Sequence, residues 1–447
     1  MSSVSVRFDV KQGCIKPVHG VGQPPLKGVN TDAFHYLDDA NIPYSRLHDV
    51  GGWFGGNLFV DIPNIFRDFN ADAYAEASYD FTFADLLINA LIRHHCMPIF
   101  RLGVTIENFC RIRSYRINPP EDFQKWAAIC EHIIRHYNEG WANGFFCGIE
   151  YWEIWNEPDN SPVPEENPMW RGSAEQFLSL YKITAVHLRR CFGERIKIGG
   201  YGSCGFYWVN NEQLVGAAAM GKEVIDKSDW QKRIAWFNTF FERFIEMVKR
   251  ERLPLDFFSH HSYAAVEDTL NMESYLEGRL DAYGLTNVEI HLNEWNPNAR
   301  PAERGTSAAS ANAAAFLIAM HATRIRLMCY YDARIGSSVY GGLFHPATGE
   351  PYCTYYVFQA FGRLYAMGTQ TECTCTGDGL YAIAAKGKGK RGVLIANTGA
   401  DTVVKTNLSG AFTAWLIDEK HLMREVALSP AEFTLPASTV VYLECKT

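Results

Sequence analysis

The alternation of short apolar runs with longer helical stretches across residues 18–331 is the feature that most constrains the fold. Helical stretches such as 81–94 and 174–191 repeat apolar residues every three or four positions. Short apolar runs between such helices are typical of βα units around a parallel sheet. Eight runs predict an α/β fold, a (β/α)₈ TIM barrel rather than an open sheet. The expected strands are 18–21, 44–49, 97–104, 151–156, 196–200, 257–263, 288–294 and 328–331.

The C-terminal part of the chain has a different pattern. Short stretches of alternating apolar and polar residues, such as 380–386 and 391–397, are separated by turn residues, and they predict an antiparallel β-sandwich. The N-terminal stretch 4–10 alternates in the same way and is expected to join it. A chain of 447 residues exceeds the roughly 250 of one barrel. We therefore expect a catalytic barrel at 13–350 and an accessory β-sandwich domain built from 1–12 plus 351–447.

Composition argues against several classes of partner. A formal net charge of −8 makes binding to nucleic acid or to an anionic membrane surface a poor expectation. No apolar run reaches the roughly 20 residues that span a bilayer, and the first residues do not read as a secretory signal. The 12 cysteines form no CxxC pair and are read as free thiols in a reducing compartment, so a cytoplasmic location is expected. A homo-oligomer stays open.

Two acidic residues follow Asn at the ends of expected strands. Glu157 lies in WEIWNEPDN, at 152–160, and Glu294 lies in EIHLNEWNP, at 289–297. The carboxyl ends of barrel strands form the catalytic face, where residues from different strands converge. A pair of carboxyl groups on that face is the equipment for glycoside cleavage, in which one donates a proton and the other attacks or supports the anomeric carbon.

The two glutamates have to differ in ionisation. A less polar surrounding and the charge of its partner are expected to keep Glu157 protonated, while hydrogen-bond donors keep Glu294 ionised. Arg46 and Tyr263, at the ends of neighbouring expected strands, are the candidate donors. A separation of about 5–5.5 Å gives retention and one near 6.5–9.5 Å gives inversion, and residue spacing alone leaves that choice open.

Further polar residues share those strand ends, among them His48 and Asp49. His260 and His261 point to opposite faces of their strand, and we favour His261 for the site. We also count Trp295 as substrate-binding. Structural alternatives remain: Arg46 could serve a purely structural ion pair, and Trp155 and Trp295 could pack beside the strands.

No metal or cofactor is expected from the sequence. The run 94–96 (His-His-Cys) and the pair Cys373 and Cys375 have no matching second half of a ligand set. No glycine-rich phosphate loop follows a strand, because the glycines at 199–205 are read as a loop.

The motifs resemble one family of glycosidases. WNEP after the fourth strand and an Asn-Glu strand end three strands later are similar to the retaining barrel glycosidases, and within them the chain most resembles glycoside hydrolase family 39, the β-xylosidase and α-L-iduronidase family. The resemblance covers roughly residues 15–365. Its supporting stretches are 45–50, 79–103, 119–130, 151–160, 256–264, 288–296 and 340–364.

The resemblance implies roles for individual residues. It makes Glu157 the general acid/base and Glu294 the nucleophile of a retaining mechanism. Asn156 hydrogen-bonds the sugar 2-hydroxyl, and three further residues line the subsite of the non-reducing sugar: His48, His261 and Tyr263. Two departures bear on the sugar. Arg101 stands where the family usually has an acidic residue, and the loop 51–69 is rich in glycine and aromatic residues.

The expected function is release of a terminal sugar from oligosaccharides or glycosides by a β-xylosidase-like enzyme, without cofactor. Within the same chemistry the alternatives are an arabinosidase, a galactosidase, an iduronidase-like enzyme or a transglycosylase. From another class, the alternative is a carbohydrate-binding barrel without activity, although such a protein usually loses one of its two carboxylates.

Overall fold

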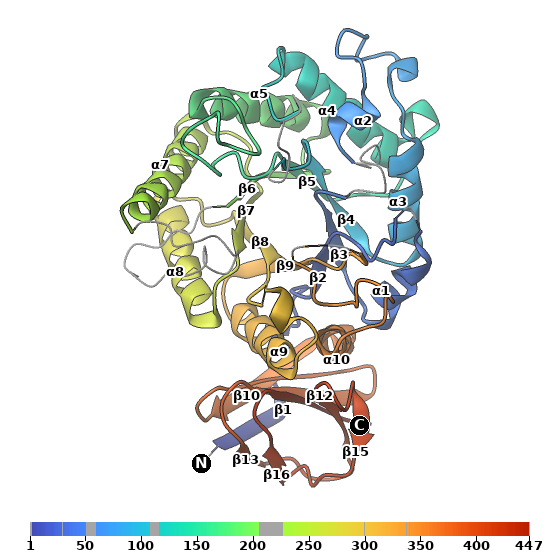
Figure 1. Cartoon of the computed structure of the whole chain (residues 1–447), viewed down its shortest axis with the longest axis vertical. Coiled ribbons are helices and arrows are strands. Elements are labelled where there is room, and N and C mark those ends of the chain that lie inside the picture. Colours follow the sequence, from blue (N-terminus) through green and yellow to red (C-terminus); the bar gives the residue numbers. More distant parts are fainter. Residues whose placement is uncertain are drawn as a thin grey trace.

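The computed structural model describes residues 2–28, 30–50, 60–107, 116–204, 227–298, 300–336, 338 and 340–446, with side chains of the segment that begins at 227 described from 232 onward. A closed barrel of parallel strands, in the order β2 to β9, forms its centre, and the helices surround it (Figure 1). This confirms the predicted TIM barrel. The strands are β2 Gly20–Gly22, β3 Tyr44–Leu47, β4 Met97–Leu102, β5 Tyr151–Ile154, β6 Lys197–Ser203, β7 Phe257–Ser262, β8 Glu289–Trp295 and β9 Ile325–Tyr331.

The helices of the outer layer begin and end at recognisable signals. Asp122 caps α4 by accepting hydrogen bonds from the next backbone amides, and the left-handed Gly140 ends it. Ser173 and Gln176 form a capping box at the start of α5. No helix in the described ranges is long and apolar enough to cross a membrane. The α-helices are α1 His35–Asp39, α2 Ile62–Ile65, α3 Thr82–Arg93, α4 Phe123–Glu139, α5 Ala174–Phe192, α7 Lys227–Glu251, α8 Val266–Ala282, α9 Ser307–His321 and α10 Cys353–Met367.

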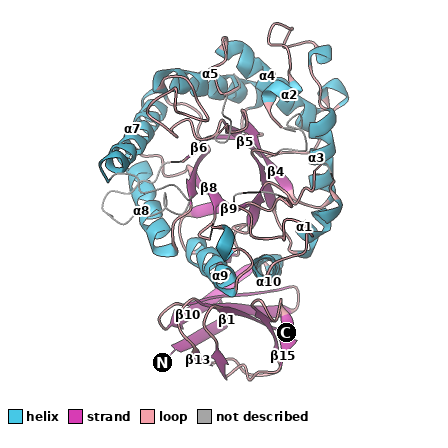
Figure 2. Cartoon of the chain, viewed as in Figure 1, coloured by secondary structure: helices cyan, strands magenta, loops and turns pink. Residues whose placement is uncertain are grey.

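Both chain ends lie in a second unit beside the barrel (Figure 2). It is one curled sheet in the order β15-β14-β17-β12-β11-β10-β1-β13-β16, antiparallel except for the parallel pair β1 and β13. This confirms the accessory β domain. Its strands are β1 Ser2–Cys14, β10 Thr369–Thr376, β11 Leu380–Gly387, β12 Lys390–Asn397, β13 Thr402–Thr406, β14 Thr413–Ile417, β15 Arg424–Val426, β16 Glu432–Leu435 and β17 Thr439–Lys446.

The central strands of this sheet are buried on both faces. On β12, Leu394 and Ala396 join the barrel's hydrophobic core, whereas Val393 and Ile395 belong to a separate apolar cluster enclosed by the curl of the sheet. Successive residues of a strand point to opposite faces, so one strand serves both cores. Helices α9 and α10 lie between the barrel strands and the sheet and contact β11 and β12.

Candidate active site

Glu157 lies on a tight turn just beyond β5. Trp155 and Glu157 have left-handed backbone angles, with φ of 70° and 43°. The turn is held from both sides, because the Trp155 amide donates to the Leu102 carbonyl and the Glu157 amide donates to the Gly202 carbonyl, each at 2.9 Å. Such backbone angles are costly for non-glycine residues and persist where the surrounding structure enforces them, often at functional sites.

Glu294, on β8, is surrounded by hydrogen-bond donors. The Arg46 guanidinium donates Nη1–H to Glu294 Oε1 at 2.8 Å, and the Tyr263 hydroxyl donates to Oε2 at 2.7 Å. His48 Nε2 lies 3.4 Å from Oε1. Arg46 is fully buried and its pKa is raised, because the charges of Glu153 and Glu294 outweigh the opposing effect of burial. Glu294 therefore accepts one hydrogen bond from a permanently charged guanidinium and one from a phenol.

Glu157 has a less polar environment. Burial raises the pKa of its carboxyl group, and the negative charge of Asp49 acts in the same direction. Its Oε1 lies 2.7 Å from His261 Nδ1, and its Oε2 accepts a hydrogen bond from the Asn160 side chain at 2.8 Å. Burial also lowers the pKa of His261 to about 3, so that ring is neutral at ordinary pH. The two glutamates thus stand in the contrasting environments that an acid and a nucleophile need.

The two carboxyl groups are close to each other. One oxygen of Glu157, one oxygen of Glu294 and a ring nitrogen of His261 all lie within 4.8 Å of one another. His261 Nδ1 is 3.4 Å from Glu294 Oε2, so the imidazole lies between the carboxylates.

Glu153 belongs to the same network and was missed by the sequence reasoning. It accepts from Arg46 Nε at 2.7 Å, and from Ser259 and Asn293 at 2.6 Å each. Burial alone raises the pKa of Glu153, but the charge of Arg46 outweighs it and the net shift is downward. Its signal was available, because a charged residue in the middle of the apolar run 151–156 has to point into the barrel.

Asn156 completes this network. Its Oδ1 accepts from Arg46 Nη2 at 2.5 Å. Its buried Nδ2 has no hydrogen-bond partner in the described part of the chain. A buried amide without a partner is costly, which makes it a candidate donor for a bound ligand.

Three tyrosines form one wall near Glu294. Tyr340, in the segment after β9, has its ring centroid 5.0 Å from those of both Tyr263 and Tyr331. Burial and the charges of Glu157 and Glu294 raise the pKa of Tyr340. Neither Tyr331 nor Tyr340 was singled out from the sequence. Tyr331 ends β9 and Tyr340 lies in the segment after it, and only the fold brings the two rings together.

Other residues considered from the sequence lie elsewhere. Trp295 is fully buried, and its ring stacks on that of Phe316 with ring centroids 4.4 Å apart. The structure therefore does not bring Trp295 to the carboxyl groups of Glu157 and Glu294. His260 faces away from the site and pairs with Glu273 at 2.7 Å. Trp155 is also buried, with its ring against Trp126 and Trp170.

Arg101 is fully buried and donates to Asp61 at 2.8 Å. Asp61 also accepts from the backbone and the side chain of Thr105. Arg101 therefore has an anionic partner within the protein. The first nine positions of the loop 51–69 lie outside the described residues, so its expected part in the entrance is not placed.

Two groups of side chains among the described residues have metal-ligating atoms close together. One is the group of Glu157, His261 and Glu294, where Arg46 already forms an ion pair with Glu294. The other is Glu131, His187 and Cys191, in the outer helix layer.

Similarity to known proteins agrees with this geometry. Residues 38–323 match the family described as Glycosyl hydrolases family 39. The β-xylosidase of Geobacillus stearothermophilus is 21% identical over 223 residues, 47% of this chain and 36% of that protein, so the chain matches only about a third of that relative's length.

Solved structures share the fold over the whole chain. A glucosidase from Croceicoccus marinus has a TM-score of 0.77 at 18% identity, covering 100% of this chain and 99% of that one. A family 39 β-xylosidase from Caulobacter crescentus has a TM-score of 0.67 at 15% identity, covering 100% of both chains. The family match extends from before β3 to just past α9 and includes both glutamates. This chain belongs to glycosyl hydrolase family 39.

Proposed function

We propose that this chain is a retaining glycoside hydrolase in which Glu157 is the general acid/base and Glu294 the nucleophile. One observation carries the proposal: oxygens of the two carboxyl groups lie within 4.8 Å of each other, and burial raises the pKa of Glu157 while Glu294 is paired with Arg46 and Tyr263. A separation of about 5–5.5 Å between such groups is typical of retaining enzymes, because no room is left for water to attack directly.

The reaction follows from these two environments. Glu294 Oε attacks the anomeric carbon as the glycosidic C–O bond breaks, and Glu157 gives its proton to the leaving oxygen. Glu294 loses its negative charge when its oxygen bonds to the anomeric carbon, while Arg46 and Tyr263 hold its side chain in place by hydrogen bonds. Glu157, now ionised, then takes a proton from a water molecule, and that water releases the sugar from Glu294.

Three further residues are assigned to sugar binding in this proposal. Asn156 offers its unpartnered Nδ2–H to the 2-hydroxyl of the reacting sugar. His48 and His261 line the same subsite, since both lie within 3.4 Å of Glu294 oxygens. Hydrogen bonds to the 2-hydroxyl strengthen in the transition state and contribute several kcal/mol in such enzymes.

The proposed substrate is a terminal β-xyloside of a short oligosaccharide. The β-xylosidases among the similar proteins support this choice. An arabinoside, a galactoside and a uronic acid stay as alternatives, and the similarity to a glucosidase fold adds a glucoside to the sugars worth testing. We keep the cytoplasm as the proposed compartment, because the cysteines among the described residues are all unpaired.

The test is release of nitrophenol from a panel of aryl glycosides by the wild type, Glu157→Gln and Glu294→Gln. We expect turnover of the β-xyloside and a loss of about 10²-fold or more in each variant, because general acid/base catalysis alone contributes about 10²–10⁴-fold. Glu425→Gln, on β15 of the accessory sheet, is the matched control and should keep full activity.

The variants should also differ from each other. A dinitrophenyl leaving group needs no proton, so it should restore the first step in Glu157→Gln but not in Glu294→Gln.

NMR of the first sugar released should show the anomer of the substrate. Inversion would contradict the covalent intermediate, and turnover confined to another sugar would replace the β-xyloside. Absence of turnover on every glycoside by folded wild type would favour a binding protein, and transfer to added alcohols in place of hydrolysis would indicate a transglycosylase.

A further inference from the structure

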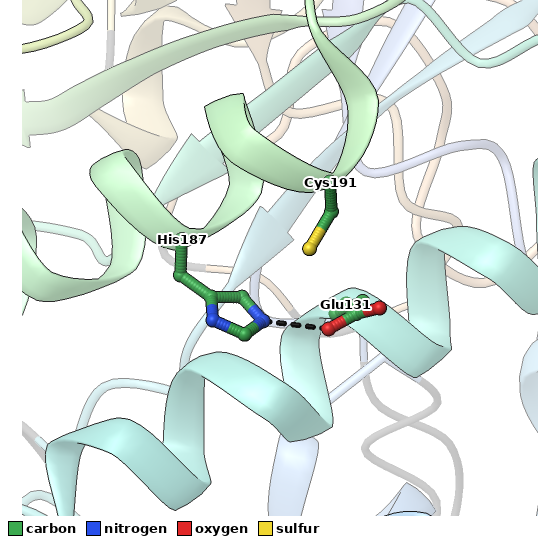
Figure 3. Close-up of side chains that lie close together, drawn as sticks. All are labelled: Glu131, His187 and Cys191. Atoms are coloured by element: carbon green, nitrogen blue, oxygen red, sulfur yellow. Dashed lines mark hydrogen bonds and ion pairs between the residues drawn. The ribbon is translucent and has the colours of Figure 1, made fainter.

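Glu131, His187 and Cys191 lie together on the outer helix layer, apart from the barrel mouth. His187 and Cys191 are four residues apart on α5, so they share one face of that helix. Glu131 comes from α4, which packs against α5. Figure 3 shows the imidazole and the thiol projecting from one helix toward the carboxylate on the other.

The three side chains present three kinds of ligand atom. A thiol sulfur, an imidazole nitrogen and a carboxylate oxygen all lie within 4.8 Å of one another. His187 Nε2 is 2.6 Å from Glu131 Oε2. Cys, His and Asp/Glu are the ligands of Zn²⁺ in proteins, at about 2.0–2.3 Å from the metal. A cation among the three atoms therefore requires only small side-chain movements.

The surroundings fit a bound cation. Glu131 and His187 are each 8% exposed and Cys191 is half-buried, so the group is partly sheltered from solvent. With three protein ligands, a zinc-class cation takes a water as its fourth ligand. Arg135 binds Glu131 Oε1 at 2.7 Å and leaves Oε2 facing the group. Carboxylates that ligate metals are commonly fixed by such a second hydrogen bond.

Two contacts have to change. The hydrogen bond between His187 Nε2 and Glu131 Oε2 opens to admit the cation. Arg190 Nη2 lies 3.1 Å from His187 Nδ1, and binding through Nε2 requires that the ring proton sit on Nδ1. Arg190 is exposed, so water can replace it there without leaving a buried group unpaired. The negative charges of Glu131 and of a thiolate balance the nearby positive charges of Arg135 and Arg190.

We propose that Glu131, His187 and Cys191 form a site for a zinc-class divalent cation that links α4 to α5, with three protein ligands and an open fourth position. Binding exchanges the Cys191 thiol proton, which passes to solvent, for an S–metal bond, and it shifts the His187 ring proton from Nε2 to Nδ1. Strand β5, which leads to Glu157, lies between α4 and α5 in the chain, so the cation links the two helices that flank the acid/base strand.

Cobalt titration of the full-length protein, stripped with a chelator, tests the site. Co²⁺ bound by a thiolate gives a sulfur-to-metal charge-transfer absorption that oxygen and nitrogen ligands alone do not give. We expect one Co²⁺ per chain with this absorption, its displacement by Zn²⁺, and a higher melting temperature with Zn²⁺, because a ligand of the folded state stabilises it.

Variants identify the ligands. Cys191→Ser should lose the absorption, and His187→Gln, which can still hydrogen-bond Glu131, should weaken binding by at least about 10-fold. Cys147→Ser, at another half-buried thiol, is the control and should bind as the wild type does. Absence of the absorption in the wild type would overturn the proposal, and so would an absorption that survives in Cys191→Ser. His187→Gln is informative even if Cys191→Ser does not fold.

Discussion

Arg46 organises the charges in the barrel mouth. It is fully buried and contacts Glu153, Asn156 and Glu294 with three different nitrogens. Removing one member of a buried ion pair costs about 3–5 kcal/mol, because the partner is left charged without compensation. The sequence left open whether Arg46 contacts Glu294 or forms a structural ion pair. In the structure Arg46 does both, because it pairs with Glu153 and also contacts the proposed nucleophile.

The pH dependence of activity should follow Glu157. In the proposed mechanism the first step requires the protonated form of Glu157, and burial raises the pKa of that group, so kcat/KM should fall only as the pH rises through the raised value. The Asn160 side chain donates to Glu157 Oε2 and favours the ionised form. Asn160→Ala should therefore raise the pKa of Glu157 further and move the basic limb of the kcat/KM profile to higher pH.

The control for this experiment is Asn70→Ala, at an exposed position, which should leave the profile unchanged. A basic limb that stays in place or moves to lower pH in Asn160→Ala would mean that another group controls it.

Among the elements, β6 positions the turn that carries Glu157 through its backbone. Gly202 on β6 has a φ of 61° and accepts the amide of Glu157 through its carbonyl. A methyl group at Gly202 would come within 2.9 Å of Asn156 Oδ1 and 3.0 Å of Arg46 Nη2. The strand therefore presents bare backbone to the polar network, and only glycine fits both its space and its backbone angle.

Gly202→Ala should disturb the site and the fold together. The left-handed backbone and the close contacts predict a loss of about 1–3 kcal/mol in the free energy of unfolding and at least about a 10-fold loss of kcat/KM. Gly278→Ala is the matched control on the exposed face of α8, where an added methyl meets no atom within 4 Å. It should stabilise the helix by about 0.5–1 kcal/mol. Chemical unfolding measures the free energy of unfolding of both variants, and steady-state kinetics measures kcat/KM. Equal effects of the two substitutions would contradict this account of β6.

At the scale of the whole molecule, the barrel and the sheet share apolar core. Leu394, Ala396, Val440 and Tyr442 belong to the cluster that contains the barrel residues. Our expected boundaries, 13–350 for the barrel and 1–12 plus 351–447 for the sheet, leave α10 with the sheet. Because α10 contacts α9 as well as β11 and β12, we propose that α10 connects the two units by packing against both.

A shared core predicts that the units unfold together. Leu394→Ala should lower the free energy of unfolding by about 2–5 kcal/mol, because it leaves a cavity between the sheet and the helices. Activity, which reports on the barrel, and far-UV circular dichroism should be lost in one transition shifted by the same amount. Val403→Ala, at a position 45% exposed on β13, should change little. Two separate transitions, with only the first moved in Leu394→Ala, would show that the units unfold independently.

The sequence by itself determined the order of strands and helices, the closure into a barrel and the two strand-end glutamates. It could do so because the spacing of apolar residues and the position of a carboxylate after a strand are local properties of the chain. The alternation of apolar and polar residues predicted the accessory sheet and the N-terminal strand that joins it.

Only the tertiary structure decided which polar residues meet. Glu153 and the tyrosines of the wall come from different strands and loops, and Trp295 lies with Phe316 although it follows Glu294 directly in the chain. Glu131 lies beside His187 and Cys191 because two helices pack together, and this contact cannot be predicted from the spacing of the three residues in the sequence. The physical reason is the same in each case: distances between side chains on different elements depend on packing and burial, and these are set by the whole core rather than by any local stretch.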